Sequence, residues 1–473
     1  MPHLGATARV PTRRAAELWL LLFAVVVVFA AEAIVESAQG GRLDWHLLAY
    51  GAGVPAVAGI VAHLVVRWVA PYADPLLLPC VVALNGLGLV MIHRGDLGVE
   101  QQYRDSGVPF PGAVAPTQVL WTACGLLLFL AVLVLVRDHR ALAQYAYTLA
   151  LVGLFLLVLP AVLPASLSEV NGARIWIKLP GFSIQPGEFA KILLTVFAAA
   201  YLVAKRDVLS LAGRRVLGLT LPRGRDFGPL LAAWAVCIGM LVRENDLGTS
   251  LLFFGLFLVL LYVATERISW VIVGLLLFTG GAYLAYGMFD TVRTRVTVWL
   301  HVFTADSGDQ MRQSLFGLGT GGMFGTGLGS GHPELVPLPR SDFIISSFGE
   351  ELGLFGLVAL LLIYAVLIMR GFAAGLAVRD SFGTLLAAGL SFLIGLQLFI
   401  VVAGVTRLLP QTGLVTPWLS YGGSALLANY ILLALLLRVS DSARRPADRR
   451  DPGPAPIPVP TRAPAQPAVG SMA

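Results

Sequence analysis

Charged residues are scarce in this sequence. Asp, Glu, Lys and Arg together make up 13% of its 473 residues, whereas hydrophobic residues make up 57%. Ordinary soluble domains carry about 25% charged residues, and the mean hydropathy here is +0.81. These values exclude an ordinary soluble domain and indicate an integral membrane protein.

Cysteine is almost absent as well. The three cysteines, Cys80, Cys124 and Cys237, are odd in number and all lie in apolar stretches. Buried cysteines of this kind behave as small hydrophobic residues. The sequence therefore implies neither a disulfide framework nor a thiolate metal site.

Apolar stretches of about 20 residues, the length that a helix needs to cross a bilayer, recur along nearly the whole chain. They lack the alternating polarity of barrel strands. We therefore expect an all-α polytopic membrane protein with about twelve transmembrane helices. The predicted spans are residues 18–38, 46–66, 76–92, 117–136, 142–164, 187–204, 227–243, 247–265, 268–289, 350–369, 382–404 and 417–437. The first has the features of a signal sequence, with Arg13 and Arg14 before its apolar core, but eleven further spans follow and we expect it to be retained.

The distribution of Lys and Arg predicts the orientation, because basic loops stay cytoplasmic. With the N-terminus inside, 21 of the 33 basic residues fall on the cytoplasmic side, 11 fall on the other side, and Lys191 lies within a span. Both termini are therefore predicted to be cytoplasmic.

The net charge of +6 is concentrated in these cytoplasmic loops. That distribution favours anionic lipid headgroups over nucleic acid as the partner of the basic residues. Residues 1–17 are predicted to be a cytoplasmic tail, and the Pro-rich residues 440–473 a disordered one, because their composition cannot bury a core.

The longest predicted loop, residues 290–349, lies on the outer side and contains the stretch GLGTGGMFGTGLGSG. Gly317, Gly319 and Gly322 match G-x-G-x-x-G, but no strand precedes them and no Walker lysine follows. We therefore expect no nucleotide site. The glycines indicate either tight folding or close approach of backbone to a ligand, or else a flexible loop.

Several ionisable residues lie at the outer ends of predicted spans. Glu188 and Lys191 are three residues apart, so on a helix they share a face and neutralise each other. Such residues are functional candidates, although an ion pair that stabilises the bundle is the alternative. Asp246 directly precedes the predicted span 247–265, at its outer end, where it is either a helix cap or a functional acid.

The stretch LPRSDFIISSFGEELG places three acids against an apolar run. Ser347 and Glu350 have the S-x-x-E spacing of a capping box, which would explain Glu350. Asp342 has no such structural explanation and is predicted to face the outside.

Several long motifs in this order resemble the SEDS proteins, the RodA and FtsW type of bacterial cell-wall polymerase. They are NGARIWIKLPGFSIQPGEFAK, ENDLGTS, QSLFGLGTGGMFGTGLGSG, SDFIISSFGEELGLFG and TGLVTPWLSYGGSALLANY, within residues 74–438. The resemblance implies a ten-helix core, here residues 74–439. Two extra helices, within residues 18–73, precede it and resemble a longer actinobacterial branch.

The resemblance also implies an activity. Members polymerise lipid II, an undecaprenyl-pyrophosphate-linked disaccharide pentapeptide, at the outer face of the bacterial cytoplasmic membrane, for elongation or division. They work with a divalent metal, Mg²⁺ or Mn²⁺, and without haem or flavin, beside a class B penicillin-binding protein. By motif, Asp342 corresponds to the essential, catalytic aspartate. The motifs depart from the family at QPGE, ENDLGT and RSDF, but each retains its acid.

Glycosyl transfer needs a base for the attacking hydroxyl and positive charge beside the leaving diphosphate. We expect Asp342 to be the base. The candidate cations for the diphosphate are Lys191, Arg407, Arg293 and Arg295. Asp246 and Glu188, with Asp342, are the candidate metal ligands; alternatively they orient Lys191.

The last span begins with the small residues Ser420, Gly422 and Gly423. These permit close approach of other helices or of an isoprenoid tail. Two other functions remain open at this point. A lipid II flippase or transporter would place its charges near the membrane midplane, between inverted repeats, and a non-catalytic scaffold would leave the acids without a role.

Overall fold

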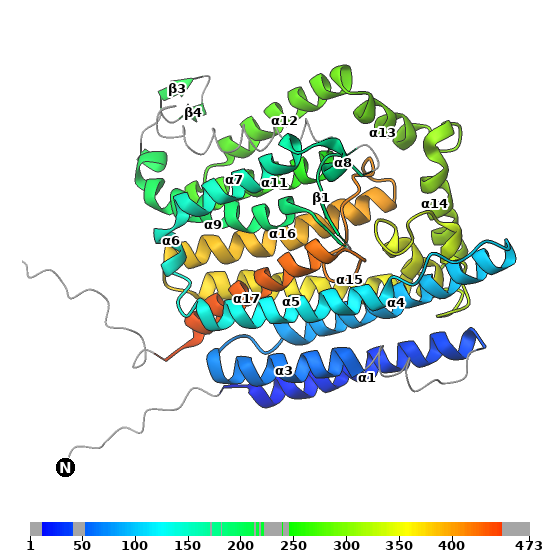
Figure 1. Ribbon diagram of the computed structural model, residues 1–473. Helices are drawn as coiled ribbons and strands as arrows, with labels where there is room; N and C mark the ends of the chain where they lie inside the picture. Colours follow the sequence, from blue (N-terminus) through cyan, green and yellow to red (C-terminus); the bar gives the residue numbers. More distant parts are fainter. Residues whose placement is uncertain are drawn as a thin grey trace, which may run out of the picture. The chain divides into compact units, whose positions relative to one another are not determined.

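Long apolar helices make up almost all of the chain that the structure describes. This computed structural model describes residues 12–40, 53–170, 173–180, 182–211, 214–216, 219–221, 239 and 246–446 (Figure 1). Within these ranges, nine helices are long and apolar enough to cross a membrane. They are α1 (Arg14–Ala38), α4 (Leu77–Asp105), α5 (Ala115–Leu135), α9 (Pro186–Leu211), α11 (Leu247–Thr265), α12 (Ile268–Met288), α15 (Ile344–Ala377), α16 (Ser381–Val405) and α17 (Gly423–Arg444).

Two shorter apolar helices, α3 (Val54–Val69) and α7 (Ala146–Val162), coincide with two further predicted spans. The prediction of an all-helical polytopic membrane protein is therefore confirmed. The predicted span 227–243 lies outside the described residues except for Gly239. Two single-turn helices, α6 (Ala141–Gln144) and α8 (Ala165–Ser168), flank α7.

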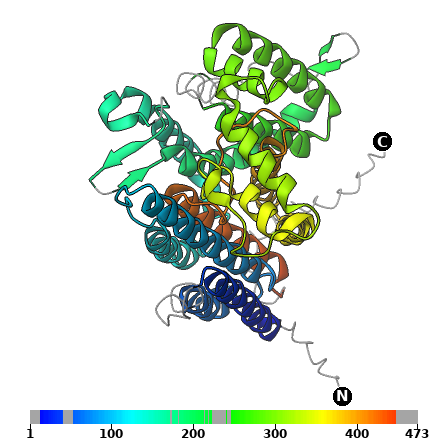
Figure 2. The same cartoon turned by 90° about the vertical axis from the view of Figure 1, so that its right-hand side faces the viewer.

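The two N-terminal helices form a pair on one side of the remaining helices. Helix α1 packs against α3 and α4, and α3 also contacts α5. Figures 1 and 2 show this pair side by side along α4 and α5. Small residues allow the close approach, because Gly59 faces Leu21 of α1 and Gly86 faces Val28.

The centre of the bundle is formed by α16 and α17, which contact α9 and α15. Helix packing in a membrane depends on small residues where backbones approach. Gly389 of α16 lies against Thr195, and Gly125 of α5 lies against the ring of Tyr430. The apolar residues of this core are almost completely buried.

Two small antiparallel hairpins depart from the all-helical prediction. One pairs β1 (Ile177–Leu179) with β2 (Phe182–Ile184), and the other pairs β3 (Arg214–Val216) with β4 (Leu219–Leu221). Strands of three residues are too short to show the two-residue periodicity that identifies strands in a sequence.

The segment 290–349, predicted to be one long loop on the outer side, is largely helical. It contains α13 (Asp290–Leu300), the 3-10 turn η2 (Asp306–Gly308), α14 (Asp309–Gly321) and the 3-10 turn η3 (Pro333–Leu335). Residues 322–331, which follow α14, form the glycine-rich turn and pack on α15. The amide of Thr326 in this turn donates to the carbonyl of Glu350 at 2.9 Å. Gly325 lies at φ 81° and Gly353 of α15 at φ 66°, a region that favours glycine. The glycines therefore serve tight packing.

The predicted capping box is wrong. Helix α15 begins at Ile344, three residues before Ser347, and the preceding Phe343 offers no side-chain cap. The Ser347 hydroxyl instead donates to the carbonyl of Pro339 at 3.1 Å, and Glu350 accepts a hydrogen bond from the amide of His332 at 2.8 Å. The S-x-x-E pattern is local, whereas these partners come from the preceding turns.

Candidate active site

Asp342 borders a cavity of about 220 Å³ between α13, α14 and the loop before α17. The segment that carries it connects η3 to α15. Arg295 and Trp299 of α13, Gln310 of α14, and the loop residues Gln411 and Gly413 contribute to the wall. Gly413 has φ 75°, and a Cβ added there would lie 3.9 Å from the Asp342 carboxylate. The cavity therefore leaves the carboxylate accessible to a small polar group.

The loop before α17 fixes the backbone that carries Asp342. The Ser420 hydroxyl donates to the carbonyl of Ser341 at 2.7 Å and accepts from the amide of Thr416 at 2.9 Å. The amide of Tyr421 donates to the carbonyl of Arg340 at 2.8 Å. The predicted small residues of the last span thus position the catalytic candidate.

Gly422 and Gly423 pack in the same turn. The amide of Gly422 donates to Gln118 Oε1 at 3.4 Å, and a side chain at Gly423 would collide with the ring of Trp121. Gly423 is needed for packing against α5, whereas a Cβ added at Gly422 would meet no atom closer than 3.8 Å. Close approach of protein backbone, one of the two predicted roles, accounts for Gly423.

Burial raises the pKa of Asp342 to about 6, and a hydrogen bond from Ser341 and the charge of Arg295 oppose that rise. Burial also lowers the pKa of Arg295, while the charges of Asp246 and Asp342 oppose that fall. A carboxyl group with a pKa near neutrality is suited to exchange a proton at physiological pH. Asp342 and Arg295, both predicted as site residues, are thus brought together.

Asp246 caps α11, as one of its two predicted roles requires. Its carboxylate accepts a hydrogen bond from the amide of Thr249 at 3.0 Å. Burial raises the pKa of Asp246, the bonds from Thr249 and the charge of Arg295 oppose that rise, and the charge of Glu188 adds to it. Arg295 therefore lies in the electrostatic field of both aspartates.

Glu188 and Lys191 form the predicted ion pair on α9, with Lys191 Nζ 2.6 Å from Glu188 Oε2. Lys191 also donates to Gln397 Oε1 at 3.0 Å, and Gln397 in turn donates to the carbonyl of Val415 at 2.8 Å. The lysine is only 1% exposed. It is placed to support the loop around Val415 rather than to touch a ligand in the cavity.

Arg293 and Arg407 point elsewhere. Arg293 is exposed, lies 3.3 Å from Asp290 and donates to the carbonyl of Gly287. Arg407 donates to the carbonyls of Trp299 and Leu300 at 2.7 and 2.9 Å, at the end of α13. The structure therefore brings neither of these two arginines to Asp342.

A metal site built from all three predicted acids does not fit this arrangement. Asp342, Asp246 and Glu188 are all described, but their carboxylates do not gather within 4.8 Å of one another. Asp246 is engaged at its helix end and Glu188 with Lys191. No single ion is held by the three together.

The sequence did not predict two ion pairs that connect the segment around Asp342 and the start of α15 to α4. Arg340 pairs with Asp96 of α4, and Asp96 also accepts from the amides of Val114 and Ala115 at 2.9 and 2.7 Å. Arg340 is the first residue of the motif RSDF and had no predicted role. Asp96 follows the predicted span 76–92 in the polar stretch HRGD, so a search for charged residues within apolar spans does not find it.

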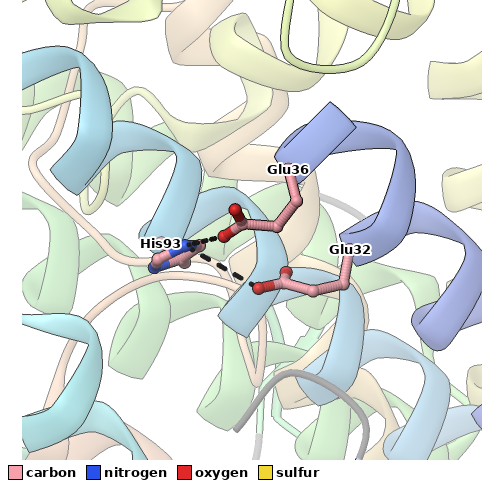
Figure 3. Close-up of side chains that lie close together, drawn as sticks. All are labelled: Glu32, Glu36 and His93. Atoms are coloured by element: carbon pink, nitrogen blue, oxygen red, sulfur yellow. Dashed lines mark hydrogen bonds and ion pairs between the residues drawn. The ribbon is translucent and has the colours of Figure 1, made fainter. Parts of the chain in front are cut away.

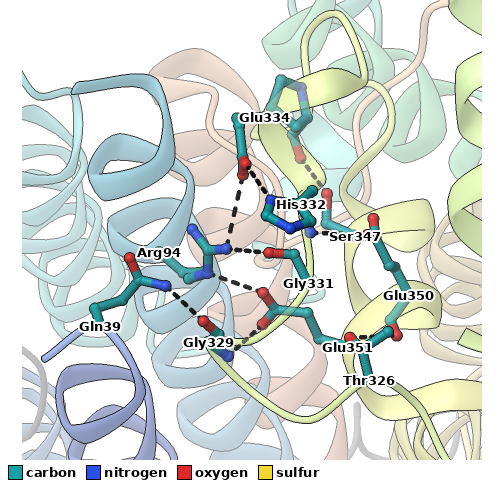
Figure 4. Close-up of polar contacts among 11 residues, drawn as sticks. Gln39, Arg94, Thr326, Gly329, Gly331, His332, Glu334, Ser347, Glu350 and Glu351 are labelled. Atoms are coloured by element: carbon teal, nitrogen blue, oxygen red, sulfur yellow. Dashed lines mark hydrogen bonds and ion pairs between the residues drawn. The ribbon is translucent and has the colours of Figure 1, made fainter. Parts of the chain in front are cut away.

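The second ion pair joins α4 to α15. Arg94 lies 2.9 Å from the carboxylate of Glu351 and donates to the carbonyl of Gly331 at 2.5 Å. Glu351 also accepts from the amide of Gly329 at 2.9 Å, and Gln39, the residue after α1, donates to the carbonyl of Gly329 at 2.5 Å. Figure 4 shows these side chains converging on the glycine-rich turn, from α4, from α15 and from the residue that follows α1. Glu351, the second of the two adjacent glutamates, thus fixes the glycine-rich turn against α4 and α15.

Comparison with known proteins agrees with this geometry. The sequence matches the family described as "Cell cycle protein", which groups FtsW, RodA and SpoVE, over residues 75–445. It is 55% identical over 456 residues to the peptidoglycan glycosyltransferase RodA of Mycobacterium tuberculosis (strain ATCC 25618 / H37Rv), covering 96% of both chains. It is 33% identical over 379 residues to a probable peptidoglycan glycosyltransferase FtsW of Geobacter sp. (strain M18), covering 78% of this chain and 97% of that one.

Solved structures show the same fold. The rod shape determining protein RodA of Thermus thermophilus superposes with a TM-score of 0.54 at 26% identity, over 80% of this chain and 100% of that one. A chain of "Structural coordination of polymerization and crosslinking by a peptidoglycan synthase complex" gives 0.54 at 25% identity, over 85% and 99%. The resemblance predicted from the motifs is confirmed: the chain belongs to the SEDS family of FtsW, RodA and SpoVE cell cycle proteins.

Proposed function

We propose that this protein is a peptidoglycan glycosyltransferase that polymerises lipid II at the outer face of the bacterial cytoplasmic membrane, during elongation or division. The observation that carries the proposal is Asp342, a carboxyl group of raised pKa beside Arg295 at a cavity between α13, α14 and the loop before α17. The relatives that are more than half identical over nearly the whole chain carry this enzyme name.

In the proposed reaction, Asp342 accepts the proton of the attacking sugar hydroxyl as the new glycosidic bond forms. A base is most effective when its pKa is near the working pH, and a pKa of about 6 meets that condition. The bond between the donor sugar and the diphosphate breaks, and the diphosphate leaves with its charge.

Arg295 is the cation that the geometry supports for the leaving diphosphate. It lines the cavity with Asp342, and it also donates to the carbonyl of Thr412 at 3.0 Å, which fixes its direction. Fixed positive charge in a partly desolvated site stabilises charge that develops in the transition state. Lys191 does not contact the diphosphate; it supports the loop at Val415 through its hydrogen bond to Gln397.

A divalent ion, Mg²⁺ or Mn²⁺, stays part of the proposal. Mg²⁺ is commonly held by one or two carboxylates together with substrate phosphates. Asp342 is the acid that borders the cavity, so it would share the ion with the diphosphate, without Asp246 or Glu188.

The proposal includes the membrane arrangement and partners expected from the sequence. Both termini lie in the cytoplasm, because the chain crosses the membrane twelve times. The chain divides into a tail over residues 1–17, two added helices within 18–73, a core over 74–439 and a tail over 440–473. Asp342 then faces outward, membrane lipids surround the bundle, and a class B penicillin-binding protein crosslinks the product. A cysteine at position 342 is expected to react with impermeant reagents added from outside, and exclusive labelling from the cytosol would contradict this orientation.

The decisive experiment measures polymerisation of lipid II by the purified protein in detergent. Asp342→Asn is expected to lose at least about 10²-fold in rate, the contribution typical of a general base. Asp309→Asn removes an exposed acid of the same outer segment, 3.4 Å from Arg312, and is expected to keep the wild-type rate. Near-normal polymerisation by Asp342→Asn would exclude Asp342 as the base.

The same protein in liposomes separates the rival functions. A flippase would move labelled lipid II across the bilayer without forming glycan chains, and a scaffold would do neither. Glycan chains formed without the partner protein support the glycosyltransferase.

A further inference from the structure

A second group of ionisable side chains lies where the N-terminal helix α1 contacts the family core. Glu32 and Glu36 are four residues apart on α1 and face His93 of α4 (Figure 3). His93 Nε2 lies 3.0 Å from Glu36 Oε1 and 3.8 Å from Glu32 Oε1. The family match begins at residue 75, so both glutamates precede it. None of the three residues belongs to the site around Asp342.

In this group, the Glu32–Glu36–His93 cluster, both glutamates are buried and the side chain of His93 is 17% exposed. Glu32 is 2% exposed, and its Oε2 is buried without a hydrogen-bond partner among the described residues. The side chain points toward His93 in Figure 3. Val28, Ala31, Val35 and Val90 form a separate buried apolar cluster on the same two helices.

The charges within the cluster do not balance. Two carboxylates carry two negative charges, and a protonated imidazole supplies only one positive charge. The charged groups that act on Glu32 within the described chain are His93 and Glu36. A buried and uncompensated carboxylate is costly unless a cation or a proton joins it.

Another contact of the same N-terminal helices shows a balanced arrangement. Glu17 of α1 lies 2.7 Å from His63 of α3 and also pairs with Arg14. The guanidinium supplies a permanent charge there. Within the described residues, His93 is the ion-pair partner of Glu32 and Glu36, and no arginine joins them.

The ligand geometry fits a metal ion. Ligands at Zn–N and Zn–O distances near 2.1 Å in a tetrahedral site are about 3.4 Å apart. The two distances from His93 Nε2, 3.0 and 3.8 Å, lie on either side of that value, and one donor atom from each residue lies within 4.8 Å of the others. An imidazole with two carboxylates suits zinc and its neighbours better than Mg²⁺.

We propose that Glu32, Glu36 and His93 bind one divalent transition-metal ion of the zinc type, which fastens α1 to α4. The ion would balance the charge of the two carboxylates. Its role is structural, because the three residues do not line the cavity at Asp342.

The position of the cluster links it to the glycine-rich turn. Arg94, next to His93, holds Gly331 and Glu351, and Gln39, one turn beyond Glu36, holds Gly329. Fixing α1 against α4 therefore fixes two of the groups that grip this turn (Figure 4).

The test is metal binding by the full-length protein in lipid nanodiscs after removal of metals with a chelator. Titration with Zn²⁺ alone, followed by calorimetry and elemental analysis, is expected to give one tightly bound ion per chain, with Mg²⁺ as the comparison ion. Glu32→Gln and His93→Gln are expected to weaken binding by at least about tenfold, since even indirect ligand partners contribute that much. The matched control is His63→Gln, which removes the buried imidazole that pairs with Glu17 between α3 and α1.

Thermal unfolding provides a readout that does not depend on binding assays. Zn²⁺ is expected to raise the unfolding temperature of the wild type and of His63→Gln, but not of Glu32→Gln. Without metal, Glu32→Gln, which is isosteric, is expected to unfold no earlier than the wild type, because it removes an unbalanced charge. An ordinary ion pair predicts the reverse, a lower unfolding temperature in that variant with or without Zn²⁺. That result, absence of stoichiometric binding, or binding that survives both Glu32→Gln and His93→Gln would overturn the proposal.

Discussion

Asp342 and Glu351 belong to one short motif, yet their side chains lie in different environments. Asp342 borders a cavity, where its carboxyl has a raised pKa. The side chain of Glu351 is fully buried and accepts hydrogen bonds from Arg94 and the amide of Gly329. Nine residues along the chain thus separate a group free to exchange a proton from one fixed in a network.

The difference arises from the partners, not from the acids. Asp342 precedes α15, in a backbone segment held by Ser420 and Tyr421, so its side chain is not needed to hold the structure. Glu351 lies inside α15, where it meets Arg94 from α4. A carboxylate in an apolar span is stable only with such a partner. Function and support can therefore be separated by mutation.

The largest expected effect on stability comes from Glu351→Ala. It leaves the Arg94 guanidinium buried without its partner, which typically costs about 3–5 kcal/mol. Equilibrium unfolding in mixed micelles measures the loss. The control is Glu100→Ala, which breaks an exposed pair with Arg104 and is expected to change the free energy by less than about 1 kcal/mol. Equal effects of the two substitutions would remove the distinction between fixed and exposed acids.

Asp342→Asn is expected to stabilise the protein while it abolishes activity. The folded-state pKa of about 6 lies above the ordinary value of 3.8, so the contribution of this group is fully present below pH 3.8 and is lost as the pH rises through 6. Above pH 6 the ionised group destabilises the fold by up to about 3 kcal/mol. The variant should therefore unfold later than the wild type at pH 8, with no difference near pH 4. A loss of stability at pH 8 would mean that Asp342 supports the fold, as Glu351 does.

The pH dependence of polymerisation tests the role of Arg295. Activity requires ionised Asp342, so below about pH 6 the rate is expected to fall tenfold per pH unit. Arg295→Gln removes a charge that opposes the raised pKa, and the acidic limb of its residual activity should move up by about one unit. Arg293→Gln, two residues away and exposed, should leave the limb in place. An unmoved limb in Arg295→Gln would contradict the pairing with Asp342.

The smallest expected effect is that of Ser420→Ala. This substitution removes the hydrogen bond to the carbonyl of Ser341 and leaves the amide of Thr416 without its acceptor. About 1 kcal/mol lost in the alignment of Asp342 lowers kcat about fivefold with little change in KM. Ser106→Ala loses only an exposed bond to its own helix and should keep both constants. A change in KM alone would place Ser420 in substrate binding instead.

Helix positions were predictable because a bilayer demands long apolar helices whatever their neighbours are. The beginning of α15 was not, since Phe343 and Ile344 carry no capping pattern and the S-x-x-E pattern at Ser347 was misleading. Within the site, Glu188 with Lys191 and the cap at Asp246 were predictable because each interaction spans three residues of one helix. Arg407 was not separable from Arg295 by sequence, because only packing directs one to the end of α13 and the other to the cavity.

The sequence by itself determined that the protein lies in a membrane, where its apolar helices are and which family it belongs to. These properties depend on composition, on local periodicity and on motifs that are continuous in the chain. Tertiary structure alone decided which acid is free and which is fixed. The partners of Asp342 and Glu351 come from α4, α13 and the loop before α17. Burial and pairing set the protonation and the freedom of a carboxyl group, and both depend on residues that are distant in the chain.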